Sequence, residues 1–256
     1  MLSATYGTLV TPALASKWNE EEDGLCKLCE DKIGTIQHIL SGCRVALGQG
    51  RYRWRHDKVL KQLTDHVTFH CERRVNTSKN PLKEKSQLIG FVPAGSKKVH
   101  EKKHLKRSFG ILAGVRDWTV MSDIDGQLKF PEDIASTRLR PDLIIFSRSA
   151  KKVLWWELTV PSEERIAESH ELKMDRYNSL QAEIQDNGWT CFSFAVEIGA
   201  RGVVARSVES AARRIGFGGR ELKRLVKDSG REAAHCSKWL YLLSRKKEWE
   251  YRNPGT

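Results

Sequence analysis

The sequence predicts a mixed α/β core at residues 108–200, and three observations support this prediction. Two runs rich in apolar, β-branched and aromatic residues, 139–147 and 152–161, flank a short polar turn, as in a β-hairpin. A long stretch with helical periodicity follows at 162–186, and a further strand-like run comes at 189–199. An earlier strand is expected at 115–124. Strands and helices in this order predict a sheet covered by helices.

The composition is that of a folded and strongly basic chain. Of its 256 residues, 39% are hydrophobic and 30% are charged, which argues against a disordered polymer. No apolar run is long enough to cross a membrane, and no basic residue precedes Lys17, so we expect no secretory signal. The formal net charge of +12 favours polyanions, most often nucleic acid. The alternative is a basic charge like that of ribosomal proteins, or one that only keeps the protein soluble.

Four potential zinc ligands follow an N-terminal linker, residues 1–24. Within residues 25–44 they have the spacing C-x2-C-x8-H-x4-C: Cys26, Cys29, His38 and Cys43. Thiolates and an imidazole at such spacing suit tetrahedral zinc, and this clustering indicates a metal site in a reducing compartment more than a disulfide framework. Buried free thiols beside a surface histidine are the alternative. A zinc knuckle can serve folding alone or bind nucleic acid, and the sequence does not separate these roles.

Residues 45–75 are expected to form a basic amphipathic helix. Apolar residues fall near helical spacing within 51–70: Trp54, Val59, Leu60, Leu63 and Val67. The polar side is expected to carry the basic residues Arg51, Arg53, Arg55, Lys58 and Lys61. This side could follow phosphates, and a solvated face on a packing helix is an equal alternative. No fourth ligand accompanies His66, His70 and Cys71, so we interpret them as ordinary residues.

The basic residues concentrate in two blocks, 73–107 and 201–256. The segment 76–107 is interrupted by proline and glycine and is interpreted as a basic linker. Its candidate nucleic-acid contacts are Lys97, Lys98, Lys102 and Lys103. A solvated tether that also serves as a nuclear signal is the alternative. The block 201–256 is expected to form basic C-terminal helices at 205–215, 220–229 and 231–247, with a glycine-rich break at 216–219.

The hairpin brings two carboxylates together. With the turn centred between Ser149 and Ala150, Ser147 pairs with Lys152, and Asp142 lies directly opposite Glu157. Directly paired residues share a face of the sheet, so the two charges need neutralising. A shared proton or a divalent metal with oxygen ligands would do this. A non-catalytic pair between Glu157 and a lysine or arginine is the alternative.

The helix at 162–186 is expected to face this site. Ser162 can cap its N-terminus, and an inward stripe is expected at Ile166, Lys173, Tyr177, Leu180 and Ile184. A lysine beside two carboxylates suits phosphodiester hydrolysis: the acids hold Mg²⁺, and the lysine stabilises negative charge or positions water. The alternatives are a snorkelling side chain for Lys173 and a core aromatic for Tyr177.

These residues, in this order, resemble a known family. The phrases HILSGC, RYRWRHDKVL, RPDLII, WELTVPSEERI and VEIGARG carry the likeness, which covers nearly the whole chain. They resemble the C-terminal region of site-specific non-LTR retrotransposon polyproteins that carry a restriction-enzyme-like endonuclease. The resemblance implies a core similar to the PD-(D/E)XK nuclease fold, a mixed four-stranded sheet with flanking helices, between a small CCHC knuckle and C-terminal helices.

The resemblance also implies residue roles. Asp142 and Glu157 would bind Mg²⁺ or Mn²⁺, Lys173 would be the catalytic lysine, and Tyr177 matches a tyrosine one turn later. Cys26, Cys29, His38 and Cys43 match the family's zinc knuckle. Arg55 and His56 match a basic-histidine motif thought to contact DNA. Two departures stand out: Asp57 replaces the usual asparagine after that motif, and Thr159 stands where many such nucleases have their lysine.

In the family the endonuclease nicks chromosomal DNA in the nucleus, and the exposed 3′ end primes reverse transcription. The implied partners are DNA and RNA, together with the reverse transcriptase domain of a parent polyprotein. We find no reverse transcriptase segment, so the chain is interpreted as a polyprotein fragment or a stand-alone remnant. A nucleic-acid-binding remnant without activity and a structural zinc protein are the competing hypotheses. Glu197 is expected to pair with a basic neighbour and not to add a metal ligand.

Overall fold

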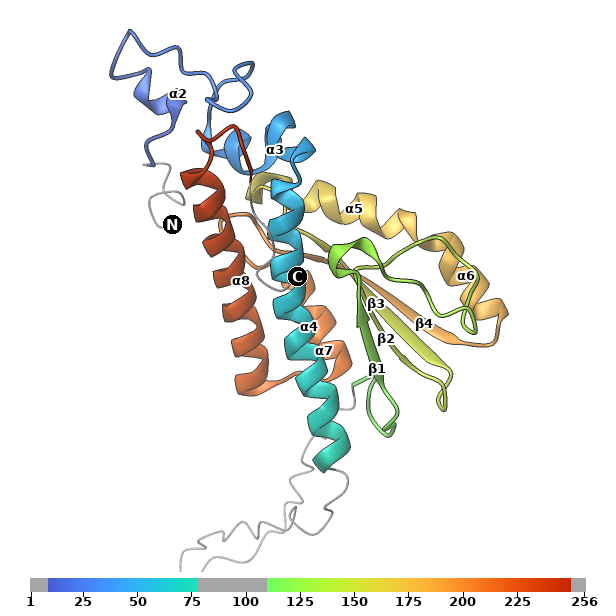
Figure 1. Ribbon diagram of the computed structural model, residues 1–256. Helices are drawn as coiled ribbons and strands as arrows, with labels where there is room; N and C mark the ends of the chain where they lie inside the picture. The colour runs from blue at the N-terminus through green and yellow to red at the C-terminus, as the bar shows by residue number, and fades with distance from the viewer. Residues whose placement is uncertain (1–8, 78–109, 250–256) are drawn as a thin grey trace, which may run out of the picture.

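The computed structural model describes residues 9–77 and 110–249, and a four-stranded mixed sheet forms its centre (Figure 1). The strand order is β1-β2-β3-β4. Strands β1 (Thr119–Ser122), β2 (Leu143–Ser147) and β3 (Lys152–Thr159) are antiparallel neighbours, and β4 (Thr190–Glu197) runs parallel to β3. The predicted α/β core with a mixed sheet is therefore confirmed.

The predicted hairpin register is also confirmed. Ser147 pairs with Lys152, and the ladder continues to Leu143 opposite Trp156. The next pair in this register is Asp142 opposite Glu157. Alternation along β3 places Leu154, Trp156 and Leu158 in one hydrophobic cluster, and Val153 and Trp155 in another on the opposite face. Apolar clusters therefore cover this strand on both faces.

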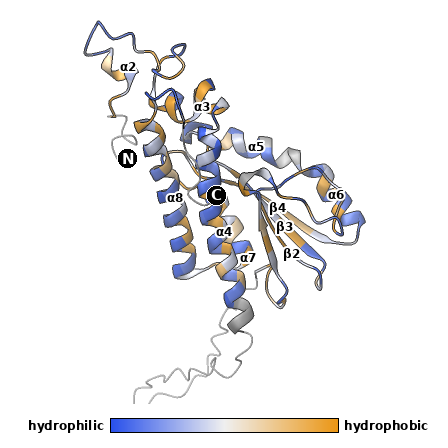
Figure 2. Cartoon of the chain, viewed as in Figure 1, coloured by the Kyte–Doolittle hydropathy of each residue, from blue (hydrophilic) through white to orange (hydrophobic). Residues whose placement is uncertain are grey.

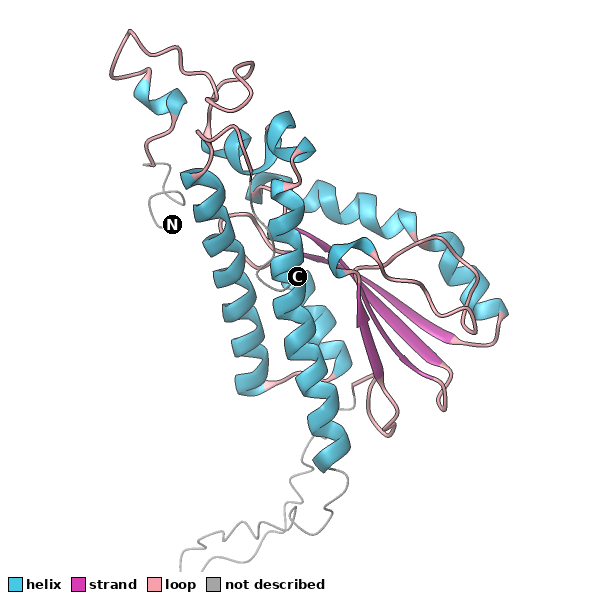
Figure 3. Cartoon of the chain, in the orientation of Figure 1, coloured by secondary structure: helices cyan, strands magenta, loops and turns pink. Residues whose placement is uncertain are grey.

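Helices cover both faces of the sheet, so the molecule has three layers (Figure 3). One face packs against α4 (Arg51–Thr77), α7 (Arg206–Ile215) and α8 (Gly219–Leu242). The other packs against α5 (Ile166–Arg176) and α6 (Asn178–Asp186). Figure 2 shows hydrophobic and hydrophilic bands alternating along α4 and α8, as in amphipathic helices. Of the described helices, none is long and apolar enough to span a bilayer.

Helix α4 belongs to the main core. Its residues Val59, Leu60 and Leu63 lie in the same cluster as the apolar residues of β2 and β3. Helices α4 and α8 also lie side by side along most of their length (Figure 1). The basic helix and the C-terminal helices predicted as separate segments are therefore integrated with the sheet.

Two predicted helix boundaries are wrong. The two C-terminal helices expected at 220–229 and 231–247 form the single helix α8, which continues through Gly230. A Cβ atom on Gly230 would lie 2.6 Å from the Gly202 carbonyl oxygen, so this glycine permits close packing and does not end the helix. The helix expected at 162–186 is instead a 3-10 turn, η4 (Glu163–Arg165), followed by α5 and α6, which are separated at Tyr177. Ser162 takes the N-cap position of η4 without a side-chain capping bond.

A small N-terminal module sits against the ends of α4 and α8. It contains α2 (Pro12–Ala15), the π-helix η1 (His38–Gly42) and α3 (Arg44–Gly48). An isolated bridge joins Leu25 to Ile33. Ile39 and Leu40 of η1 pack with Leu240 of α8, which attaches the module to the helical layer.

Candidate functional site

The structure brings together all four predicted zinc ligands. The ligand atoms of Cys26, Cys29, His38 and Cys43 lie within 4.8 Å of one another, and Cys29 Sγ is 3.3 Å from His38 Nε2. Four ligands at roughly 2.0–2.3 Å from a tetrahedral zinc ion would be separated by roughly 3.3–3.8 Å. The donor set and its compactness therefore fit a structural zinc ion.

The backbone around Cys29 favours its thiolate, whereas burial raises the pKa of Cys43 to about 11. The Glu30 amide donates to the Cys26 carbonyl at 2.8 Å, which closes the turn between the first two ligands. Burial opposes ionisation of Cys29, but hydrogen bonds from the backbone of Lys32 and Asp31 outweigh it, so the pKa of this thiol is lowered. A thiolate is the form that binds zinc.

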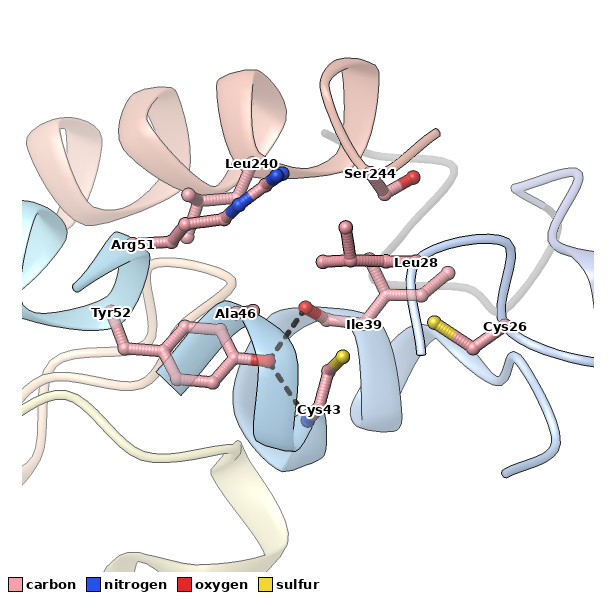
Figure 4. Close-up of a pocket in the computed structure, with 9 residues that line it drawn as sticks. All are labelled: Cys26, Leu28, Ile39, Cys43, Ala46, Arg51, Tyr52, Leu240 and Ser244. Atoms are coloured by element: carbon pink, nitrogen blue, oxygen red, sulfur yellow. Dashed lines mark hydrogen bonds between the residues drawn. The ribbon is translucent and has the colours of Figure 1, made fainter. Parts of the chain in front are cut away.

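Tyr52 of α4 ties the second half of the zinc cluster to the core (Figure 4). Its hydroxyl donates to the Ile39 carbonyl at 2.9 Å and accepts from the Cys43 amide at 3.0 Å. It thereby bridges the two ends of the segment that leads from His38 to Cys43. We infer that Tyr52 orients the last ligand of the cluster.

The structure corrects the predicted basic face of α4. Arg51 and Arg55 are each only 1% exposed, so they do not belong to a solvent-facing strip. Arg51 donates to the Leu243 and Lys246 carbonyls at 2.8 and 2.7 Å, which satisfies the C-terminal end of α8. These two arginines are structural, and the predicted DNA contact through Arg55 is wrong for this conformation.

Arg55 joins three parts of the fold. Its guanidinium donates to the Leu40 carbonyl at 2.9 Å, to Ser237 Oγ at 3.0 Å and to the Val160 carbonyl at 2.9 Å. These acceptors belong to the N-terminal module, to α8 and to the segment that follows β3. Burial lowers the pKa of Arg55 to about 10, which leaves it charged at neutral pH.

The predicted acidic site forms at one end of the hairpin. The Asp142 amide donates to Glu157 Oε2 at 3.4 Å, and the Leu158 amide donates to Asp142 Oδ2 at 2.7 Å. Lys173 of α5 donates to Glu157 Oε1 at 2.5 Å. Asp142, Glu157 and Lys173 are therefore brought together as the sequence predicts, with side-chain exposures of 13%, 3% and 23%.

The surroundings of Glu157 pull its pKa in both directions. Burial and the charge of Asp142 raise this pKa, while Lys173 and a hydrogen bond from Tyr177 act in the opposite direction, and the net shift is upward. Tyr177 is 1% exposed and packs near Trp155. The inward stripe is thus confirmed at Lys173 and Tyr177, and Tyr177 is a core aromatic that also contacts the acid.

His56, for which the family resemblance implies a DNA contact, lies in this acidic site. Its Nε2 is 3.4 Å from Asp142 Oδ2 and 3.3 Å from the Leu158 carbonyl oxygen, and its Nδ1 is 3.0 Å from Asp57 Oδ1. Burial disfavours the charged imidazole, but hydrogen bonds to Asp142 and Asp57 outweigh it and raise the pKa of His56 to about 9. The protonated ring therefore helps to neutralise the acidic pair. The signal available in the sequence was Asp57, a carboxylate directly after His56 that also departs from the family pattern.

A second polar cluster lies at the end of β4. Glu197 has the basic neighbour that was expected for it: its Oε1 lies 2.8 Å from His170 Nδ1. Ser207 Oγ donates to Glu197 Oε2 at 2.5 Å. The sequence singles out Glu197 but not His170, which lies three residues before Lys173 on α5.

An open cleft is lined by the segment of the chain that precedes Asp142. It has a volume of about 680 Å³ and is lined by residues 126–130, 132 and 136–140. Lys129, Arg138 and Arg140 contribute positive charge to its walls, and Arg140 lies two residues before Asp142. Lys97, Lys98, Lys102 and Lys103, the predicted nucleic-acid contacts of the linker, lie outside the described residues.

Together these features define an α/β protein with a four-stranded mixed sheet and a cysteine-histidine cluster that could bind zinc. No protein-family model matches the chain, and no curated protein is detectably similar to it in sequence.

Proposed function

We propose that this chain is a metal-dependent DNA endonuclease with a PD-(D/E)XK core, which nicks target DNA as non-LTR retrotransposon endonucleases do. One observation carries the proposal: two carboxylates on paired strands of the central hairpin meet a lysine from the covering helix. Lys173 Nζ lies 2.5 Å from Glu157 Oε1, and the backbone of Asp142 lies 3.4 Å from Glu157 Oε2. A second carboxylate beside the first adds repulsion, which a bound cation would offset.

The donor set fits Mg²⁺ or Mn²⁺. Hard divalent cations prefer carboxylate oxygens, and Asp142 and Glu157 would supply one from each strand. Such an ion, when bound, polarises the phosphate and lowers the pKa of water. Lys173 would position the attacked phosphate and stabilise the charge that develops on its oxygens. Tyr177 would restrain the Glu157 side chain from the buried side.

The charge distribution supports a nucleic-acid substrate. The net charge is +12, and the cleft lined by residues 126–130, 132 and 136–140 carries Lys129, Arg138 and Arg140 against Glu132. Phosphate contacts of this kind supply affinity independent of base sequence. We propose DNA as the substrate, RNA and a reverse transcriptase domain of the parent polyprotein as further partners, and the nucleus as the place of action.

A second candidate function is a nucleic-acid-binding remnant that no longer cuts. His56 and Lys173 already neutralise the acidic pair without a metal, and His56 Nε2 contacts an oxygen of Asp142. A cation at this site must therefore share or replace these contacts. This ion-pair network is the observation that supports the remnant as the second candidate.

The test is nicking of supercoiled plasmid in Mg²⁺ by the wild type, Asp142→Ala and Glu157→Ala. We expect metal-dependent nicking that each substitution reduces by at least about 100-fold. Asp133→Ala is the matched control, because Asp133 is an exposed carboxylate paired with Arg148 on the surface. Absence of nicking by the wild type would favour the remnant, and nicking that survives both substitutions would reject this site.

A further inference from the structure

A buried carboxylate at the end of β4 holds an exposed histidine. Glu197 is 2% exposed, whereas the His170 side chain is 43% exposed. Their contact, 2.8 Å between Glu197 Oε1 and His170 Nδ1, is reinforced by the Ser207 hydroxyl, which donates to the other carboxylate oxygen at 2.5 Å. Ser207 lies in the first turn of α7 and His170 on α5, so three elements meet at one carboxylate.

This arrangement fixes the orientation of the imidazole. A carboxylate that accepts from Nδ1 sets the plane of the ring and leaves Nε2 at its opposite corner for proton transfer. Among the residues that the structure describes, no hydrogen-bond partner is recorded for Nε2 of His170. The ring is thus anchored from the protein interior, while 43% of the His170 side chain is exposed to solvent.

The dyad of His170 and Glu197 lies beside the acidic site. In the parallel register of β3 and β4, Glu157 pairs with Ala195 and Thr159 pairs with Glu197. Glu157 and Thr159 are two residues apart on β3 and share a face, so Glu157 also shares a face with Glu197, the partner of Thr159. With ~4.8 Å between strands and ~3.3 Å rise per residue, the Cα atoms of Glu157 and Glu197 are roughly 8 Å apart. Helix α5 spans this separation, because His170 and Lys173 are about one turn apart on it.

We propose that His170 is the general acid of strand cleavage, positioned by Glu197 and Ser207; this proposal rests on the endonuclease activity proposed above. Water attacks phosphorus and forms a P–O bond, and its proton passes to solvent. The P–O3′ bond breaks with its electron pair on O3′, and Nε2–H of His170 supplies the proton that completes the 3′-hydroxyl. The imidazole then recovers a proton from solvent.

The separation of the two clusters supports this assignment. Attacking and leaving oxygens lie roughly in line on opposite sides of phosphorus. A group displaced by one helical turn from Lys173 can therefore serve the leaving oxygen while Asp142 and Glu157 face the attacking one. In the competing interpretation the dyad only ties α5 and α7 to β4. That interpretation predicts a loss of stability without a loss specific to the leaving group.

The experiment compares two DNA substrates that differ only in the bridging 3′ atom, oxygen or sulfur, in one Mn²⁺ buffer. A thiolate leaves without protonation, so a missing general acid matters little for the sulfur substrate. We expect His170→Ala to slow cleavage of the oxygen substrate by about 100-fold or more and that of the sulfur substrate by less than about 10-fold. The ratio of the two rates does not depend on the folded fraction of the variant.

His66→Asn is the matched control, because His66 also pairs with a carboxylate, Asp228, at 3.3 Å, but between α4 and α8. It should leave both rates unchanged. Equal losses on both substrates, or no loss, for His170→Ala would overturn the general-acid assignment while leaving the nuclease proposal intact. If the wild type cleaves neither substrate, both proposals fall together.

Discussion

Replacement of Arg55 by alanine should destabilise the fold and leave the proposed DNA-binding surface in place. The three hydrogen bonds of its guanidinium are 2.9–3.0 Å long, and bonds from a charged donor contribute about 1.5–3 kcal/mol each, or about 5–9 kcal/mol together. These are net contributions, because the loss of water from the guanidinium is already included in them. Arg55→Ala should therefore lower the free energy of unfolding by about 5 kcal/mol or more.

The assay is urea unfolding followed by tryptophan fluorescence, with DNA affinity measured separately under conditions where each variant is folded. Arg53→Ala is the matched control: Arg53 lies two residues away on α4, with 57% of its side chain exposed, and should change stability by less than about 0.5 kcal/mol. The reasoning is refuted if Arg55→Ala is as stable as the wild type and instead binds DNA more weakly. That result would restore Arg55 as a direct DNA contact.

Three further predictions concern the zinc cluster and His56. Cys26→Ser should lose about one equivalent of zinc by metal analysis, while Cys191→Ser, a buried thiol outside the cluster, should retain it; equal zinc in both would exclude the site. Tyr52→Phe removes the hydroxyl that contacts Ile39 and Cys43 and should weaken zinc binding by about 10-fold or more in chelator competition, whereas unchanged affinity would show that this hydroxyl does not position the ligand. Because the pKa of His56 is raised to about 9, its stabilising contribution is complete below its ordinary value near 6.5 and disappears as the pH rises through about 9. The difference in free energy of unfolding between the wild type and His56→Gln, measured without Mg²⁺, should therefore shrink over this range, and a constant difference would contradict the pairing with Asp142.

Local rules were sufficient for the hairpin and for the zinc cluster. A polar turn between two apolar runs fixes the register, which then places Asp142 opposite Glu157. The four zinc ligands lie within eighteen residues, so their spacing alone constrains their geometry. Helical periodicity placed Lys173 and Tyr177 on the inward side, although the helix itself is divided at Tyr177.

Features that depend on packing between distant elements were not predicted. Arg51 and Arg55 were assigned to the polar face because of their charge, yet both continue the i, i+4 series that leads to Val59 and Leu63. Their acceptors are carbonyls far along the chain, so no local pattern shows that a buried arginine can be satisfied there. No local pattern predicts the role of His170 either, because its partner Glu197 lies on another element.

Gly230 is a third example. Read by itself, a glycine in a helical pattern suggests a break. Its role becomes visible only when the backbone of Gly202 packs against α8.

The central claim is that Asp142 and Glu157 form the catalytic centre of a nuclease. The most direct measurement is the single-turnover nicking rate in Mg²⁺ of the wild type and the double variant Asp142→Ala/Glu157→Ala, followed by extension of the nicked strand with a DNA polymerase. The account predicts nicking by the wild type alone, with a 3′-hydroxyl that the polymerase extends. Nicking by the double variant at the wild-type rate, or no nicking by a folded wild type, would contradict it.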